Sequence, residues 1–122
     1  MREEGPQRQE LDERTTCFAV RVVAAFRRLP RRPEADVIGR QMLRSGTSVG
    51  AQFREAKRGR SDAEFVSKLA SAHQELEETI YWFELLVRTD LVPEAKLAPL
   101  RQEAHDLSAI FTTILKNMKN RT

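Results

Sequence analysis

The sequence contains a single cysteine, Cys17, in 122 residues, so no disulfide can form within the chain. One thiol also cannot supply the cysteine pairs of a zinc finger or a similar metal site. No apolar run approaches the roughly 18 residues of a membrane-spanning helix. Residues 1–14 are rich in charge and have no apolar centre, which argues against a signal peptide and makes a cytoplasmic location the expectation.

Glycine and proline are also scarce, with five of each, and the chain lacks alternating strand patterns and Asn-Gly or Asp-Gly turns. Apolar residues instead recur every three or four positions, as on one face of a helix. This pattern predicts an all-α protein. Residues 1–10 are polar and are expected to be flexible, whereas 11–122 form one domain. The predicted helices cover residues 11–29, 33–59, 62–89 and 93–118, and their short connections favour an antiparallel up-down-up-down four-helix bundle.

Proline and a capping motif mark the helix boundaries. Pro30 and Pro33 bracket the first connection, and proline is favourable in the first turn of a helix. Ser61 and Glu64 have the spacing of a capping box, so a new helix is expected directly after Gly59. A turn this short predicts that the second and third helices are antiparallel neighbours.

Two glycines interrupt the apolar stripe of the second predicted helix. Gly46 and Gly50 lie four residues apart and therefore on neighbouring turns of one face. Each glycine in a helix interior costs roughly 1 kcal/mol relative to alanine. We interpret both as packing positions that let another helix approach closely.

Charge is distributed unevenly along the chain. The net charge is +3, but residues 1–60 carry +6, residues 61–110 carry −6 and residues 111–122 carry +3. A basic region of this kind is typical of proteins that bind nucleic acid, and also of subunits that pair with an acidic surface. The candidate nucleic-acid-binding residues fall into two groups, with Arg27, Arg28, Arg31 and Arg32 in the first and Arg54, Lys57, Arg58 and Arg60 in the second.

The third predicted helix carries three glutamates beside its apolar stripe, Glu75, Glu78 and Glu84. These carboxylates either form a solvated face or pair with arginines of the second helix, within the bundle or across subunits. The arginines considered as partners are Arg40, Arg44 and Arg54.

Two neighbouring aromatic residues also lie on this helix. Tyr81 and Trp82 precede Phe83, which belongs to the core stripe, so they point toward a helix edge or outward. Their surroundings are acidic, whereas platforms for base stacking normally lie among cations. Tyr81 and Trp82 are therefore candidates for a subunit interface, with base stacking as the competing use.

No catalytic pattern emerges from the residues that carry chemistry. His73 and His105 lack the glutamate three residues earlier that di-iron bundles require, and no glycine-rich loop follows a strand. Cys17 is expected to be a small buried or interfacial residue rather than a nucleophile. We therefore expect no enzyme activity, no cofactor and no metal site.

An ordered set of motifs runs through residues 40–92. The motifs are R-S-x-x-S-x-G-A at 44–51, E-A at 55–56, F-x-x-K-L at 65–69, E-x-x-E at 75–78 and Y-W-x-E-L-L at 81–86. Together they resemble the 23S rRNA-intervening-sequence proteins, small bacterial proteins often called four helix bundle proteins. The resemblance extends over most of residues 15–118. Gly46 departs from it, because the family more often has alanine at this position.

This resemblance implies a left-handed antiparallel four-helix bundle that assembles as a homopentamer. Some relatives are encoded inside inserts of large-subunit ribosomal RNA genes. A distant branch serves diversity-generating retroelements as an accessory protein that binds nucleic acid and a reverse transcriptase. Two functions therefore remain open: an oligomer that binds RNA or DNA through phosphates with little sequence specificity, or an oligomeric protein-interaction scaffold whose charges serve subunit or partner pairing.

Overall fold

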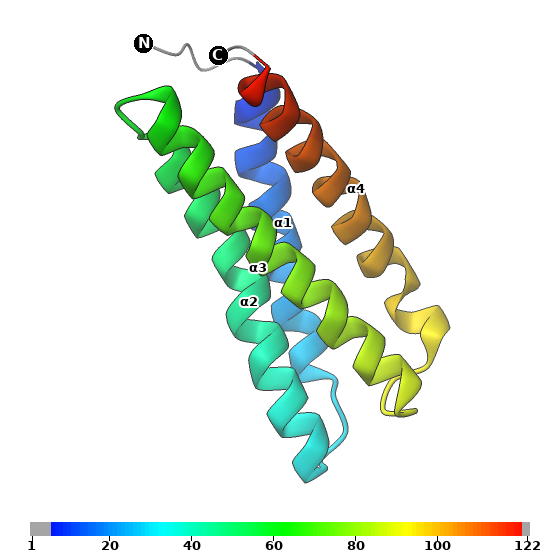
Figure 1. The fold of residues 1–122 in the computed structure, drawn as a ribbon. Helices are drawn as coiled ribbons and strands as arrows, with labels where there is room; N and C mark the ends of the chain where they lie inside the picture. Colours follow the sequence, from blue (N-terminus) through cyan, green and yellow to red (C-terminus); the bar gives the residue numbers. More distant parts are fainter. Residues whose placement is uncertain (1–5, 121–122) are drawn as a thin grey trace.

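The structure is a computed structural model that describes residues 6–120, with side chains from residue 10 onward. Its helices are α1 (Pro6–Arg27), α2 (Pro33–Lys57), α3 (Asp62–Arg88) and α4 (Glu94–Lys119). Consecutive helices run antiparallel, and α4 returns beside α1 (Figure 1). The α2–α3 contact is the most extensive and the α1–α4 contact the smallest. The all-α up-down-up-down four-helix bundle predicted from the sequence is confirmed.

The first helix begins earlier than expected. Its predicted start at Leu11 is wrong, because α1 starts at Pro6. Proline fits the first helical turn, where its missing N–H would have no partner, and the Gln, Arg and Glu residues that follow are good helix formers. Local propensity thus extends α1 beyond its apolar stripe. The flexibility expected of residues 1–10 falls in part on residues 1–5, which lie outside the described residues.

The turn between α2 and α3 uses the predicted cap. α2 ends at Lys57, two residues before the predicted end, and Ser61 caps α3. The Ser61 hydroxyl accepts a hydrogen bond from the Glu64 backbone N–H at 3.1 Å. The Glu64 carboxylate accepts one from the Arg60 backbone N–H at 2.9 Å, one residue before the usual partner in a capping box. The second basic group is therefore attached to a rigid, hydrogen-bonded turn.

Aromatic side chains fill the centre of the bundle. Phe18 of α1 meets Phe83 of α3 edge to face at a centroid distance of 6.3 Å, and Phe53 stacks on Phe111 at 5.9 Å. The seven-residue stripe predicted for the third helix is buried throughout. Its members are Phe65, Leu69, Ala72, Leu76, Thr79, Phe83 and Leu86.

α1 approaches α2 closely over three glycines. A Cβ atom at Gly46 would lie 2.8 Å from a γ-carbon of Val22, and one at Gly50 would lie 3.1 Å from the Thr15 hydroxyl oxygen. At Gly39, which the sequence did not single out, a Cβ would lie only 2.4 Å from Leu29 Cδ1 in the α1–α2 connection and 3.1 Å from a ring carbon of Phe26 on α1. The missing methyl groups therefore set the distance between the two helices.

Candidate functional site

The two basic groups lie at opposite ends of α2. The α1–α2 basic cluster consists of Arg27, Arg28, Arg31 and Arg32, and the α2–α3 basic cluster of Arg54, Lys57, Arg58 and Arg60. α2 has 25 residues, which corresponds to roughly 38 Å at 1.5 Å per residue. One protomer therefore has two separate basic regions.

The α1–α2 basic cluster is exposed and largely unneutralised. All four of its arginines are exposed. Arg32 forms an ion pair with Glu34 at 3.2 Å, whereas within residues 6–120 no ion pair joins Arg27, Arg28 or Arg31 to a carboxylate. Hydrogen bonds fix the connection that carries them, among them Arg32 N–H to the Pro30 carbonyl at 3.0 Å. The cluster thus presents guanidinium groups on a well-defined backbone.

Three members of this cluster share one hollow. Arg27, Arg31 and Arg32 line a depression of about 390 Å³ at the α1–α2 connection. The acid that also lines it, Asp36, is bound by Arg40 through a 3.0 Å ion pair. The hollow therefore offers several cations to one anionic group of a ligand. The Asp36 carboxylate in its lining is already paired with Arg40.

In the α2–α3 basic cluster one of the four cations, Lys57, is neutralised, whereas Arg54, Arg58 and Arg60 are exposed and form no ion pair within residues 6–120. Lys57 pairs with Asp12 of α1, and its side chain is only 10% exposed. Lys57 is therefore less available to an external phosphate than the arginines of the cluster, because its ammonium group serves an internal ion pair. Arg54 donates a hydrogen bond to the Thr16 hydroxyl at 3.1 Å. Arg58 lines a hollow that also contains two carboxylates, Glu55 and Glu64.

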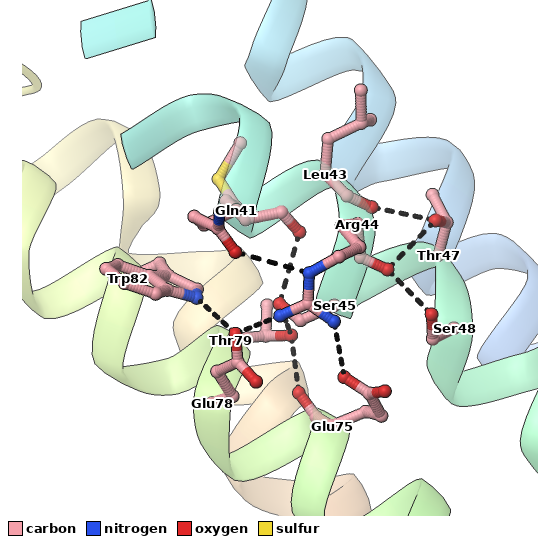
Figure 2. A network of polar contacts seen from close by, with 11 residues as sticks. Gln41, Leu43, Arg44, Ser45, Thr47, Ser48, Glu75, Glu78, Thr79 and Trp82 are labelled. Atoms are coloured by element: carbon pink, nitrogen blue, oxygen red, sulfur yellow. Dashed lines mark hydrogen bonds and ion pairs between the residues drawn. The ribbon is translucent and has the colours of Figure 1, made fainter. Parts of the chain in front are cut away.

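Two of the three α3 glutamates, Glu75 and Glu78, pair with α2, as one of the two sequence hypotheses proposed. Arg44 contacts Glu75 at 3.2 Å and also binds Glu78, so one guanidinium bridges two carboxylates (Figure 2). The Glu78 carboxylate accepts a further hydrogen bond from the indole N–H of Trp82 at 3.0 Å. Glu84 instead pairs with Arg88 on its own helix. The pairing prediction is thus confirmed for Arg44, within one protomer.

Beneath this ion pair lies a buried polar contact. The Ser45 and Thr79 hydroxyl oxygens are 2.7 Å apart, and Thr79 also donates to the Glu75 carbonyl at 2.7 Å (Figure 2). Both side chains are fully buried, so an apolar partner on either side would leave a hydroxyl without its interhelical bond. This contact fixes the register of α2 against α3.

The two aromatic interface candidates differ in exposure. Trp82 is half-buried, and its indole is held by Glu78, whereas Tyr81 is 51% exposed. Their rings meet edge to face at 5.1 Å. Tyr81 is therefore the more available of the two for contact with another molecule.

A serine, a histidine and a glutamate meet between α3 and α4. His73 Nε2 lies 3.1 Å from the Ser108 hydroxyl, which donates to the Glu77 carboxylate at 2.6 Å. In a catalytic triad the carboxylate would bind Nδ1 of the histidine. Here Glu77 lies 3.9 Å from the same Nε2 atom that faces the serine. The arrangement ties two helices together, and sequence inspection missed it because its members lie on different helices.

Cys17 was expected to be either buried or interfacial. The residue is exposed, so burial within the protomer is wrong and an interfacial role stays a prediction. Its thiol lies 3.3 Å from the Glu13 carboxylate. This hydrogen bond raises the pKa of the Cys17 thiol. Cys17 is thus kept in its less reactive, protonated form. Within residues 6–120, no three His, Cys, Asp or Glu side chains gather as a metal site.

The fold and its surface first define a class: a small all-α bundle with exposed arginines at both ends of α2. The model of the 23S rRNA-intervening sequence protein family matches residues 8–113, so the chain belongs to this family. It is also similar to a solved structure from Bacteroides thetaiotaomicron, described as a protein of unknown function from the S23 ribosomal protein family. That likeness has 34% identity and a TM-score of 0.83, and covers 89% of this chain and 97% of the other.

A search of the curated proteins gave no match. Of the helices in residues 6–120, none is both long enough and apolar enough to traverse a bilayer.

Proposed function

We propose that this protein is a non-enzymatic oligomer that binds RNA or DNA through phosphate contacts, with little sequence specificity. The observation that carries the proposal is the α1–α2 basic cluster. Arg27, Arg28 and Arg31 are exposed and form no ion pair within the described part of the chain. Exposed cations without internal partners keep their full charge for an external anion.

Guanidinium chemistry supports a phosphate ligand. Arginine donates two parallel hydrogen bonds from a planar group that matches the geometry of a phosphate. Because Arg27, Arg31 and Arg32 line one hollow, several donors can converge on a single backbone phosphate. The cluster lies at the end of the bundle, on a helix terminus and a connection, and no helix in residues 6–120 projects from there to enter a groove and read bases. The expected binding is therefore strongly dependent on salt and weakly dependent on sequence.

Assembly would strengthen a weak site. We propose a homopentamer, for which the family resemblance supplies the stoichiometry. Exposed apolar side chains support self-association: Val20 is 63% exposed, Val37 64% and Tyr81 51%. A ring repeats the arginine cluster, so that one nucleic acid can engage several copies with avidity. Light scattering should give a mass near five times 14.0 kDa, and a mass of one protomer at micromolar concentration would contradict the assembly.

A protein-interaction scaffold is the second candidate. Residues 61–110 carry a net charge of −6, and this acidic half could receive the arginines of another subunit or protein. In that case the same arginines would be buried in the assembly and would not be available to nucleic acid.

The decisive experiment compares two triple variants that remove the same charge. One replaces Arg27, Arg28 and Arg31 with glutamine, and the other replaces Arg54, Arg58 and Arg60. Binding of a labelled single-stranded RNA and a DNA duplex is followed by fluorescence anisotropy at about 50 mM salt. A hydrogen bond to a charged group contributes about 1.5–3 kcal/mol, so the first variant should bind at least tenfold more weakly.

The second variant controls for net charge and should lose less than threefold. Circular dichroism and thermal melting confirm that both variants remain folded. Equal losses in the two variants would contradict a local site at the α1–α2 basic cluster. If the wild-type protein binds neither nucleic acid, the scaffold interpretation replaces the proposal.

A further inference from the structure

An apolar cleft of about 800 Å³ lies between α1 and α4, at the end of the bundle that holds the α1–α2 and α3–α4 connections. Buried leucines contribute to its lining, among them Leu86 of α3 and Leu97 and Leu100 of α4. α1 contributes Ala24 and Ala25, whose small side chains leave the space open. The volume falls within the range of pockets that hold small molecules.

The sequence explains why the cleft opens here. α1 and α4 separate toward this end, in keeping with the small contact between them (Figure 1). Pro93 precedes α4 and Pro99 lies inside it, which sequence analysis did not single out. A proline within a helix removes one backbone hydrogen bond and favours a bend. The start of α4 is therefore not packed tightly onto α1, and both prolines line the cleft.

Every charged side chain that lines the cleft is cationic. Arg21 lies on α1, Arg28 is the first residue after that helix, and Lys96 lies in the first turn of α4. All three are exposed, and within residues 6–120 none forms an ion pair. No aspartate or glutamate lines the cleft. An apolar interior thus opens between three uncompensated positive charges.

We propose that this cleft binds a free single-chain amphiphile with an anionic headgroup, such as a fatty-acid carboxylate. The aliphatic and proline lining would hold the hydrocarbon chain, while Arg21, Arg28 or Lys96 would bind the headgroup. A nucleotide base fits less well, because no aromatic side chain lines the cleft for stacking. The proposal does not depend on nucleic-acid binding, although Arg28 belongs to both sites.

The test is isothermal titration of the wild-type protein, without nucleic acid, at amphiphile concentrations below micelle formation. Dodecanoate should bind saturably, and about 15-fold more tightly than decanoate, since each buried methylene strengthens binding about fourfold. Dodecyl phosphate should also bind, whereas dodecyltrimethylammonium should bind at least tenfold more weakly than dodecanoate. Equal affinity for the anionic and cationic amphiphiles would overturn the proposal.

Two neighbouring arginines provide a matched pair of variants. Arg28 lines the cleft and Arg27 does not. Arg28→Gln should weaken dodecanoate binding about tenfold, the effect of one charged hydrogen bond, and Arg27→Gln should change it less than twofold. Equal effects of the two variants would show that bulk charge attracts the ligand, and would overturn the cleft as its site.

A filling variant tests the apolar part independently. Ala24→Trp should abolish dodecanoate binding by occupying the cleft, provided that its circular dichroism spectrum is that of the wild type. If that variant fails to fold, Lys96→Gln on α4 provides a second test at an exposed position. This variant should weaken dodecanoate binding severalfold, and an unchanged affinity would count against the proposal. Two other results would also overturn the proposal. In the first, the protein binds phosphatidylglycerol vesicles but does not bind free dodecanoate saturably. In the second, a second copy of the chain covers the cleft and dodecanoate does not bind.

Discussion

The closest approach of α1 to α2 near the middle of the bundle can be tested by adding one methyl group. In Gly46→Ala the new Cβ would lie 2.8 and 2.9 Å from the two γ-carbons of Val22 and 3.3 Å from its β-carbon. Carbon atoms in contact normally lie 3.5–4.0 Å apart. Val22 is fully buried and β-branched, so it cannot rotate away without losing its preferred rotamer.

The expected stability change is the difference between two opposing effects. Overpacking costs about 1–3 kcal/mol, and alanine gains about 1 kcal/mol over glycine in helix propensity. Gly46→Ala should therefore destabilise the protein by about 1 kcal/mol, which lowers the melting temperature by about 4 °C for a domain of this size. Val22→Ala alone should cost about 2 kcal/mol through the cavity that it leaves.

A double-mutant cycle separates the clash from these other effects. With Val22 replaced by alanine, the methyl group at position 46 enters the vacated space, so Gly46→Ala should become stabilising by about 1 kcal/mol. Urea unfolding of all four proteins at one concentration measures the coupling, expected near 2 kcal/mol. Gly50→Ala serves as the control, because its Cβ would face Thr15 and not Val22, so Val22→Ala should leave its effect unchanged. Additive effects of the two changes would refute the packing argument.

Three further predictions follow from single contacts. Gly50→Leu should destabilise or disassemble the protein by about 1–3 kcal/mol or more through overpacking, and an unchanged melting temperature and assembly would contradict this. Arg44→Gln should lower the free energy of unfolding in urea by no more than about 1 kcal/mol, because the side chain is half exposed. This loss of stability should shrink at high salt. A loss that does not depend on salt would show that the ion pairs are not its cause. Glu13→Ala should lower the pKa of the Cys17 thiol by removing the carboxylate that accepts its hydrogen bond, so the pH midpoint of iodoacetamide alkylation should fall. The same midpoint in both proteins would count against that cause.

The sequence was sufficient for the parts of the fold that depend on local pattern. Apolar spacing identified the buried stripe of α3, and Ser61 with Glu64 marked its start, because both signals arise from neighbouring residues. The start of α1 was missed for a physical reason. Helix propensity carries the backbone through residues 6–10 even though the apolar stripe begins later.

The candidate site was predictable only in outline. The sequence located the arginines but could not show which have partners, because ion pairs between helices depend on tertiary geometry. Lys57 and Asp12 are 45 residues apart in sequence, yet their pairing makes Lys57 less available to an external ligand. Pairing between Arg44 and the α3 glutamates was one of two open hypotheses, and the structure decided it. The cleft between α1 and α4 depends on Pro99 and on how two distant segments separate.

The most direct test of the central claim is the salt dependence of wild-type binding to a DNA duplex. Anisotropy titrations between about 50 and 200 mM salt give the slope of log affinity against log salt concentration, about −0.9 for each phosphate neutralised. If Arg27, Arg28 and Arg31 each neutralise one phosphate, the slope should be roughly −2.7 for one engaged protomer and steeper when several copies bind. A slope near zero, or no binding at about 50 mM salt, would contradict phosphate recognition by this cluster.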